Sequence, residues 1–291
     1  MSSVNYDSFF SSPPIQPRKE ILAYESLWAE IEGVSFKSLN DVLRGERPSS
    51  FIERIPQKKR SEVDTFLSNH RTYQYNFLIR QTVDYPENLN VLELPIIYYQ
   101  GNLSLLSTPC VSIVGARESS PRGLDAAYRI ASSLAQEGYT IVSGLASGID
   151  TQAHTGAIDS KGRTIGVIGT PINSVYPKSN KELQEKIASE HLLISHIPFY
   201  KYSLQNWKIN RFFFPERNKV MAALSSATII VEASNKSGTL TQARAALSYN
   251  KKVIILKPTA ENKDLTWPKT YINRGAFVAE TVSDIKKILG Q

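Results

Sequence analysis

An alternation of short apolar runs with helical segments, beginning at residue 110, constrains the fold of this chain more than any other feature. Strands that are buried on both faces appear as unbroken apolar runs, and parallel neighbours need helical crossovers. Five or six such units in succession predict an α/β fold with an open, doubly wound parallel sheet. The runs are CVSIVGA (110–116), TIVSG (140–144), TIGVIG (164–169), LLISHI (192–197), ATIIVEA (227–233) and KVIILK (252–257).

The segments between these runs carry helix start and stop signals. The first helix is expected to begin with Ser120 as N-cap and Pro121 at the first helical position, and to stop at Gly138. After YPKSN, Ser179 and Glu182 have the spacing of a capping box. Further helices are expected at about 149–160, 216–224 and 237–250, and the tail GAFVAETVSDIKKIL predicts a short strand and a closing helix.

Residues 1–80 have a different pattern. The first 20 or so are rich in Ser and Pro and are expected to be flexible. From Glu20 to Ile79 the pattern is helical, with one helix ending at Gly33, one ending at Gly45, and a third that begins at Ser61 as N-cap. We therefore expect a small helical N-terminal domain over 1–80 and the α/β domain over 81–291, with LPIIYYQG (94–101) as a lead-in strand.

Charge and composition limit the possible partners and compartment. The net charge of +7 and pI of about 9.3 favour a polyanion as partner, although an ordinary basic surface has the same composition. No apolar run approaches the roughly 20 residues that span a bilayer, and the N-terminus lacks the pattern of a secretory signal. The single cysteine, Cys110, cannot form an intrachain disulfide. These features predict a cytoplasmic protein without a membrane partner.

Candidate ligand-binding residues follow the predicted strands. In an open α/β sheet, ligands bind beyond the carboxyl ends of the strands, where helix N-termini present free N–H groups. Small residues, hydroxyls and single basic side chains in these loops suit phosphates, and several such loops suit an extended polyanion better than one mononucleotide. Taken singly, each Gly or Ser is also compatible with a tight turn. The candidates are Gly115, Arg117, Ser143, Gly144, Ser147, Gly148, Tyr176, Lys178, Asn180, Arg217, Asn218, Lys236, Ser237, Gly238 and Thr239.

The motifs of several enzyme classes are absent. The chain has no G-x-G-x-x-G, no P-loop and no G-x-S-x-G, and its four histidines lack metal-ligand spacing. His154 follows Asp150 by one helical turn, and we expect this Asp to orient it rather than to act in catalysis. Glu232 either faces a ligand or accepts N–H bonds from the SGT turn. We expect no catalytic residue, metal or cofactor.

In their order and spacing, six motifs resemble the DprA/Smf family of DNA-processing proteins. The resemblance extends from about residue 81 to the end of the chain. The motifs are VSIVGAR (111–117), VSGLASGIDTQAH (142–154), GRTIGVIG (162–169), VYPKSN (175–180), FPERNKVMAALS (214–225) and VEASNKSGTLTQARAAL (231–247).

The resemblance implies an extended Rossmann-like domain that binds single-stranded DNA, forms a homodimer and loads a RecA-type recombinase during recombination and natural transformation. Arg117 and Lys178 match the family's phosphate-gripping residues, and Arg217 with Asn218 matches its PxRN motif. Ser143, Gly144, Ser237 and Gly238 match the residues that line its groove. Tyr176 or the cluster Phe212–Phe214 are candidates for stacking on bases, with core or dimer packing as the alternative for the phenylalanines.

The chain also departs from the family pattern. Its N-terminal region does not match the usual module, Gln242 stands where Thr is usual, KVIILKP ends in Lys-Pro instead of Pro-Gly, and the end at Gln291 leaves no room for a C-terminal winged helix. Two alternatives therefore stay open. One is a regulatory or phage-defence component, for example an antitoxin-like partner of an effector protein, that uses the groove as a DNA sensor. The other is a phosphoribohydrolase-like enzyme, although SNKSGTLTQA lacks the Gly-Gly-x-Gly-Thr-x-x-Glu motif of that group.

Overall fold

A single sheet organises the computed structural model, which describes residues 15–32, 35–70 and 75–290. Within these residues, nine strands follow the order β1-β2-β6-β5-β4-β3-β7-β8-β9. The strands from β3 to β9 pair in parallel, whereas β1 and β2 are antiparallel at one edge. The predicted α/β fold with a doubly wound parallel sheet is confirmed. The strands are β1 (Asn76–Ile79), β2 (Ile96–Gly101), β3 (Cys110–Val114), β4 (Thr140–Ser143), β5 (Arg163–Val167), β6 (Leu192–Ser195), β7 (Ala227–Ile230), β8 (Lys252–Leu256) and β9 (Phe277–Ala279).

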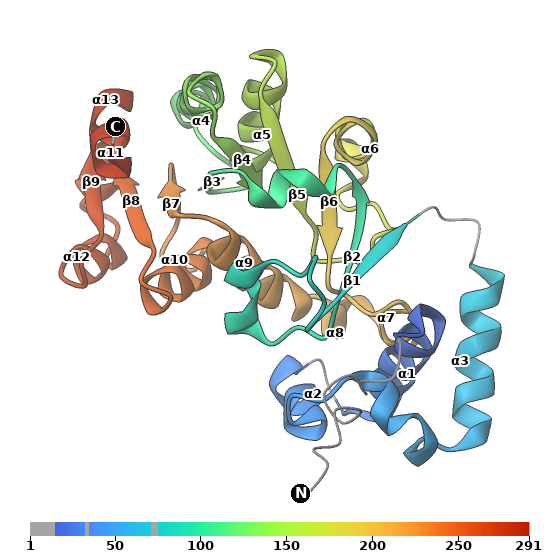
Figure 1. Ribbon diagram of the computed structural model, residues 1–291. Coiled ribbons are helices and arrows are strands. Elements are labelled where there is room, and N and C mark those ends of the chain that lie inside the picture. Colours follow the sequence, from blue (N-terminus) through green and yellow to red (C-terminus); the bar gives the residue numbers. More distant parts are fainter. Residues whose placement is uncertain (1–14, 33–34, 71–74, 291) are drawn as a thin grey trace, which may run out of the picture.

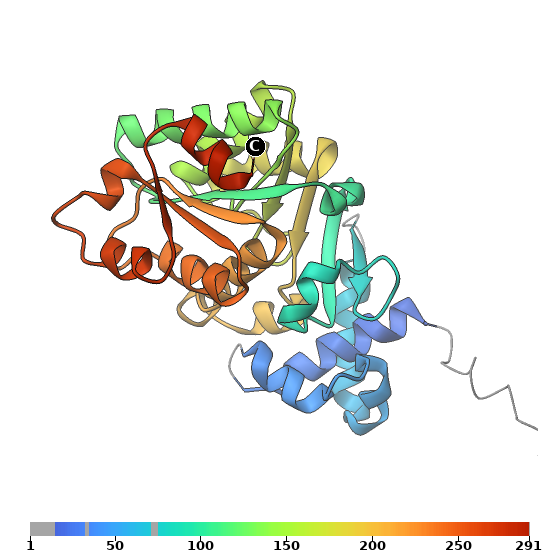
Figure 2. The same cartoon turned by 60° about the vertical axis from the view of Figure 1, so that its left-hand side comes forward.

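Helices connect the parallel strands and cover both faces of the sheet (Figure 1 and Figure 2). The longer ones are α4 (Pro121–Gln136), α5 (Ile149–Asp159), α6 (Lys181–Glu190), α9 (Phe213–Leu224), α10 (Thr239–Ser248) and α13 (Val282–Leu289). The short ones are α7 (Phe199–Leu204), α8 (Trp207–Asn210), α11 (Lys257–Ala260), α12 (Trp267–Ile272) and the 3₁₀ helices η3 (Glu87–Leu92), η4 (Leu103–Ser107) and η5 (Lys178–Asn180).

The side chains of β3 show how the sheet separates two cores. Because successive side chains on a strand point to opposite faces, Val111 and Ile113 join one buried cluster and Val114 joins the other. The first cluster includes the buried faces of α4, α5 and α13, and the second includes those of α9 and α10. Both faces are therefore apolar, as the unbroken runs in the sequence predicted.

Within the described part of the N-terminal region, four helices pack against the edge of the sheet: α1 (Pro17–Glu30), α2 (Phe36–Leu43), η2 (Pro48–Arg54) and α3 (Gln57–Asn69). The carboxylate of Glu25 in α1 is buried and accepts hydrogen bonds from the Tyr98 hydroxyl at 2.6 Å and from the N–H groups of Phe199 and Tyr200 at 3.0 and 2.9 Å. Burial raises the pKa of Glu25 to about 7. This carboxylate fastens the helical region to β2 and α7.

The helix predicted from Ser61 through Ile79 is wrong at both ends. It begins earlier, with Pro56 as N-cap, and ends at Asn69. Residues 76–79 form β1, which pairs with β2 through the register Asn76↔Tyr99 to Ile79↔Ile96. Tertiary pairing of a short aromatic and aliphatic segment therefore overrides the helical periodicity.

Two smaller predictions also need correction. Of the 20 residues expected to be flexible, residues 1–14 lie outside the described part of the chain, while Pro17–Glu20 lie in the first turn of α1. The capping box at Ser179 and Glu182 does not form, because η5 extends to Asn180 and makes Asn180 the N-cap of α6. The Asn180 side chain makes no cap hydrogen bond to α6, and its Nδ2 donates to the carbonyl of Leu145.

Candidate functional site

The loops that follow the strands converge on a groove at the carboxyl edge of the parallel sheet. The main cleft has a volume of about 460 Å³ and is lined by loops after β3, β4 and β7 together with α9. A smaller hollow adjoins it and shares Arg117, Ala146, Phe214 and Arg217 with the cleft. The structure therefore brings together most of the residues predicted from sequence. Those that line the groove are Gly115, Arg117, Gly144, Ser147, Tyr176, Arg217, Asn218, Ser237, Gly238 and Thr239.

Arg217 lies at the floor of the groove and holds its loops together. Its side chain is buried, and Nη1 donates to the carbonyl of Gly144 and, at 2.7 Å, to that of Val167. Nε donates to Oδ1 of Asn218 at 3.0 Å, and Nδ2 of Asn218 donates to the Gly238 carbonyl at 3.0 Å. Burial lowers the pKa of Arg217 to about 10, so the group stays charged at neutral pH. The PERN segment thus joins the loops after β4 and β7 to the end of β5.

Asp150 completes this buried support from the other side of the loop after β4. Its Oδ2 accepts the N–H of Gly144 at 3.1 Å and that of Ala146 at 3.4 Å. Burial raises the pKa of Asp150, while the charge of Arg217 acts in the opposite direction. A side chain at Gly144 would collide with both the Arg217 guanidinium and the Asp150 carboxylate, so only glycine fits between them.

A second glycine sets the close approach of the loops after β3 and β4. Gly148 has a φ of +78°, and a Cβ there would lie 2.6 Å from the carbonyl oxygen of Ala116. Within the described residues, the backbone N–H groups of Arg117, Ser147 and Gly148 have no hydrogen-bond partner in the protein. Unpaired N–H groups beside a helix N-terminus favour bound anions.

Three basic side chains at this edge remain exposed and make no ion pair in the described part of the chain. They are Arg117 in the loop after β3, Lys178 in η5 and Lys236 in the loop after β7. Arg117 lines the groove, with Cζ 5.8 Å from the centre of the Phe214 ring. Lys178 and Lys236 lie outside the lining of the cleft. The accessible positive charge therefore comes from different loops, as an extended polyanion requires.

Three aromatic rings gather beside the smaller hollow, and two of them, Tyr176 and Phe214, line it. Tyr176 lies 5.0 Å from Trp207 and 5.6 Å from Phe214, and the rings of Trp207 and Phe214 are 5.7 Å apart. Trp207 is 47% exposed and Tyr176 36% exposed. We call these three residues the aromatic cluster.

Sequence reasoning missed Trp207, which belongs to the short helix α8 inside the long loop before β7. Its only signal is an aromatic residue in a basic, aromatic loop. The three adjacent phenylalanines differ from one another: Phe213 is fully buried, Phe212 is exposed and Phe214 belongs to the aromatic cluster. Their segment is helical and not extended.

Ser143 and Asn180 support the loops and do not line the groove. Ser143 is buried and donates to the Ile113 carbonyl at 2.7 Å. Nδ2 of Asn180 donates to the Leu145 carbonyl and to Oγ1 of Thr151, both at 2.9 Å. Gln242, which departs from the family pattern, is buried at the lining of the cleft and donates to Oγ of Ser112 at 2.9 Å.

The two candidates for acid–base chemistry have structural partners. His154 is not oriented by Asp150 as predicted, since its Nδ1 lies 2.7 Å from Oγ1 of Thr164, and burial lowers its pKa to about 3. Glu232 accepts the N–H and hydroxyl of Ser120 at the start of α4, instead of the SGT turn. Among the described residues, no His, Cys, Asp and Glu side chains cluster as a metal site would need, and no helix is long and apolar enough to cross a bilayer.

Known proteins match both the sequence and the fold. The sequence profile of the family described as DNA recombination-mediator protein A matches residues 76–290. Protein Smf from Synechocystis sp. is 33% identical over 267 residues, which cover 90% of this chain and 63% of the relative. The chain thus spans less than two thirds of that protein's length.

Two solved structures resemble this fold. DNA processing protein A from Streptococcus pneumoniae matches with a TM-score of 0.69 and 27% identity, over 99% of this chain and 98% of that one. DNA processing protein A from Helicobacter pylori, whose structure describes a single-stranded-DNA binding mode of that protein, matches with a TM-score of 0.63 and 28% identity, over 75% of this chain and 96% of that one. Every residue that lines the groove falls within the profile match.

Proposed function

The chain belongs to the DNA recombination-mediator protein A family, and we propose that it binds single-stranded DNA in its groove and acts in DNA recombination. The groove itself carries this proposal. One edge of the sheet presents unpaired N–H groups, the exposed Arg117 and the aromatic cluster, in which Tyr176 and Trp207 are exposed. Phosphate-binding groups combined with stacking surfaces are the usual means by which proteins hold single strands without sequence preference.

Two kinds of group at the groove have separate roles in this proposal. Arg117, Lys178 and the free N–H groups bind phosphates, while Tyr176 and Trp207 stack on bases. A stacked base contributes about 1–3 kcal/mol, whichever base it is. A duplex hides its bases inside the helix, so only a single strand can contact both the phosphate-binding groups and the stacking rings.

The proposed role is binding and not catalysis. Asp150 accepts hydrogen bonds from two backbone N–H groups, His154 is buried against Thr164, and Glu232 binds Ser120 at the start of α4. Each titratable side chain that sequence analysis considered for chemistry thus has a partner that accounts for its position. The family description, a mediator of recombination, agrees with this role.

The protein partners are part of the proposal too. We propose a homodimer that passes its strand to a RecA-type recombinase. One support for the dimer is strand β9, an edge strand of the sheet on which Phe277 and Val278 are 44% and 42% exposed. Sedimentation of the wild-type protein and of Val278→Lys tests the dimer: the variant should be monomeric if this edge forms the contact.

Fluorescence anisotropy tests the DNA proposal directly. Labelled oligo(dT), a mixed-sequence single strand and the matching duplex are titrated at several salt concentrations. We expect preference for both single strands, with a log–log salt slope of about −2 to −5 for roughly three to seven neutralised phosphates. A duplex bound as tightly as the single strands would contradict the proposal.

Matched basic residues at the opposite edge of the sheet control for net charge. Arg117→Ala and Lys178→Ala should each lower affinity about tenfold, because each removes a charge-assisted contact. Arg274→Ala and Lys251→Ala remove the same charges just before β9 and β8, where neither side chain has a partner in the described structure. Equal losses in all four variants would show that net charge, and not the groove, binds the DNA.

A further inference from the structure

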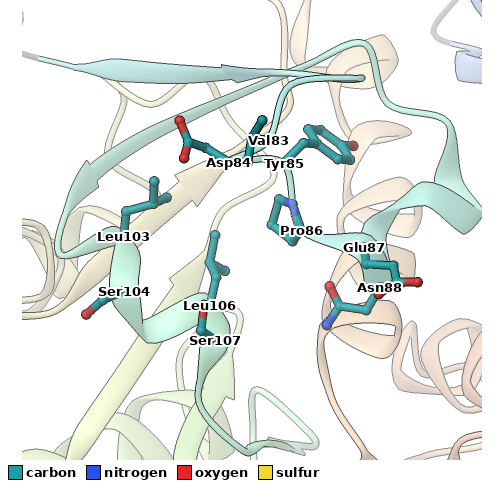
Figure 3. Close-up of a pocket in the computed structure, with 10 residues that line it drawn as sticks. All are labelled: Val83, Asp84, Tyr85, Pro86, Glu87, Asn88, Leu103, Ser104, Leu106 and Ser107. Atoms are coloured by element: carbon teal, nitrogen blue, oxygen red, sulfur yellow. The ribbon is translucent and has the colours of Figure 1, made fainter.

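A pocket of about 730 Å³ lies at the amino-terminal edge of the sheet, opposite the groove. Figure 3 shows its two walls, residues 83–88 and residues 103–107. The second wall, η4, leads directly into the start of β3. On the first wall, Nδ2 of Asn88 donates to the carbonyl of Leu224, the last residue of α9 before the start of β7. Both walls therefore lie where parallel strands begin, whereas the groove lies where they end.

Hydrogen bonds fix both walls, so the pocket is preformed. In the first wall, the hydroxyl of the buried Tyr85 donates to the Leu94 carbonyl at 2.9 Å. Beside the second wall, Oγ1 of Thr108 donates to the Leu105 carbonyl at 2.6 Å and lies 2.6 Å from Oγ1 of Thr140. Preformed pockets of about 300–1,000 Å³ are typical of binding sites.

The lining combines apolar side chains with unpaired carboxylates. Val83 is fully exposed, and Leu103 and Leu106 line the opposite wall, with Leu106 directed into the space between the walls (Figure 3). Asp84 and Glu87 are exposed and have no ion-pair partner within the described residues. None of the ten lining residues is basic, although the chain carries a net charge of +7.

These features select one kind of occupant. The two carboxylates repel the phosphates of a nucleic acid. They attract Lys or Arg side chains, whose aliphatic stems pack on apolar residues such as Leu103 while their charged ends reach a carboxylate. We propose that this pocket docks a partner protein through a segment in which basic residues flank a large apolar side chain. Because the groove lies at the opposite edge, the partner and a DNA strand can be bound at the same time.

Selection from a displayed library of random 12-residue peptides tests this proposal with the full-length protein. The targets are the wild-type chain, Asp84→Lys/Glu87→Lys, and the control Asp41→Lys/Glu46→Lys, which reverses two exposed, unpaired carboxylates outside the pocket. We expect wild type and control to enrich peptides with Lys or Arg next to Leu, Ile or Phe, and the pocket variant not to enrich them. Identical enrichment on all three targets, no enrichment, or enrichment of acidic peptides would overturn the proposal.

A labelled synthetic peptide with the enriched sequence then gives the magnitudes. Its affinity should fall at least tenfold in Asp84→Lys/Glu87→Lys and at least threefold in Val83→Ser, and should stay within twofold in the control. Equal thermal unfolding midpoints of the variants verify that they fold. Saturating oligo(dT), corrected for its own binding of the peptide measured without protein, should leave peptide affinity unchanged within twofold, and competition beyond that correction would overturn the separation of the two sites.

Self-association is the remaining alternative occupant. If sedimentation shows a dimer that Asp84→Lys/Glu87→Lys dissociates, and no peptide distinguishes wild type from variant, the occupant is a second copy of this chain and the proposal is wrong. The peptide result does not depend on DNA binding, so the two proposals can fail independently.

Discussion

Two arginines that face the same ring have different surroundings. The guanidinium carbons of Arg117 and Arg217 each lie 5.8 Å from the centre of the Phe214 ring, yet Arg117 is exposed and Arg217 is only 5% exposed. Arg117 has no hydrogen-bond partner for its side chain in the described structure, whereas Arg217 donates to Gly144, Val167 and Asn218. Residues of the same type at one site therefore differ in role: some are free to bind a ligand, and others hold the loops of the groove together.

We use two names for this division. The wall is the set of exposed residues around the groove, namely Arg117, Tyr176, Lys178 and Trp207. The frame is the set of buried residues at and below the floor of the groove, namely Asp150, His154, Arg217 and Asn218. If the division is correct, changes in the frame alter the free energy of unfolding, and changes in the wall alter only DNA affinity.

The largest expected effect is that of Arg217→Ala. Removing the guanidinium leaves two buried carbonyls without donors and Asp150 without its nearby positive charge, which should cost about 3 kcal/mol or more of unfolding free energy. Chemical denaturation measures this loss. Arg217→Lys keeps the charge without the fork of donors and should fall between alanine and wild type. A variant as stable as wild type would place Arg217 in the wall.

Gly148→Ala should have the next largest effect, about 2 kcal/mol or more. The change adds a clash with the Ala116 carbonyl to the strain of a backbone conformation (φ +78°, ψ −123°) that is nearly restricted to glycine and alone costs roughly 1–3 kcal/mol. Gly275→Ala is the matched control, because Gly275 has a φ of +97° with no atom within 4 Å of the added Cβ. Equal unfolding midpoints for the two variants would show that the loops after β3 and β4 do not need their close approach.

A pH dependence of the frame should be smaller. Burial lowers the pKa of His154 to about 3, below its ordinary value of 6.5, so the unfolded chain takes up a proton first and stability is lost as the pH falls below about 6.5. Between pH 7.5 and 5.5, wild type should lose about 1 kcal/mol more than His154→Gln. The buried His196 is present in both proteins, so its contribution cancels. Parallel pH profiles for the two proteins would remove His154 from the frame.

The smallest effect on stability is expected from Arg117→Ala. Because the side chain is exposed and unpaired, the free energy of unfolding should change by less than about 0.5 kcal/mol while DNA affinity falls. Thermal unfolding and anisotropy on the same sample measure both quantities. A loss of unfolding free energy together with a loss of DNA affinity would mean that Arg117 also stabilises the loops of the groove.

The sequence predicted the sheet well because its signals are local. Unbroken apolar runs such as CVSIV and ATII mark strands that are buried on both faces, and the turn residues after them mark the edge where ligands bind. The hairpin strand β1 was not predicted, because only its pairing with β2 distinguishes NFLI from the end of a helix. Pairing between distant segments leaves little trace in a short stretch of sequence.

The site was predicted as a set of loops but not as a wall and a frame. The PERN segment supplies Arg217 and Asn218, and the spacing of its residues does not tell how deep their side chains lie. How deeply these side chains are buried depends on carbonyls from other segments, such as those of Val167 and Gly238. Trp207 was missed for a related reason, since its neighbour Tyr176 comes from the loop after β5, far from Trp207 in the sequence.

The fluorescence of Trp207 tests the central claim, that the wall binds both phosphates and bases of a single strand. The other two tryptophans, Trp28 and Trp267, are buried, so a change in emission on binding reports on Trp207. Wild type and Trp207→Phe are titrated with oligo(dT) and with an abasic strand of the same length. We predict quenching by oligo(dT) in wild type, none in Trp207→Phe, and at least fivefold weaker binding of the abasic strand, the loss of one stacked base. Equal affinity for the two strands without quenching would contradict the account.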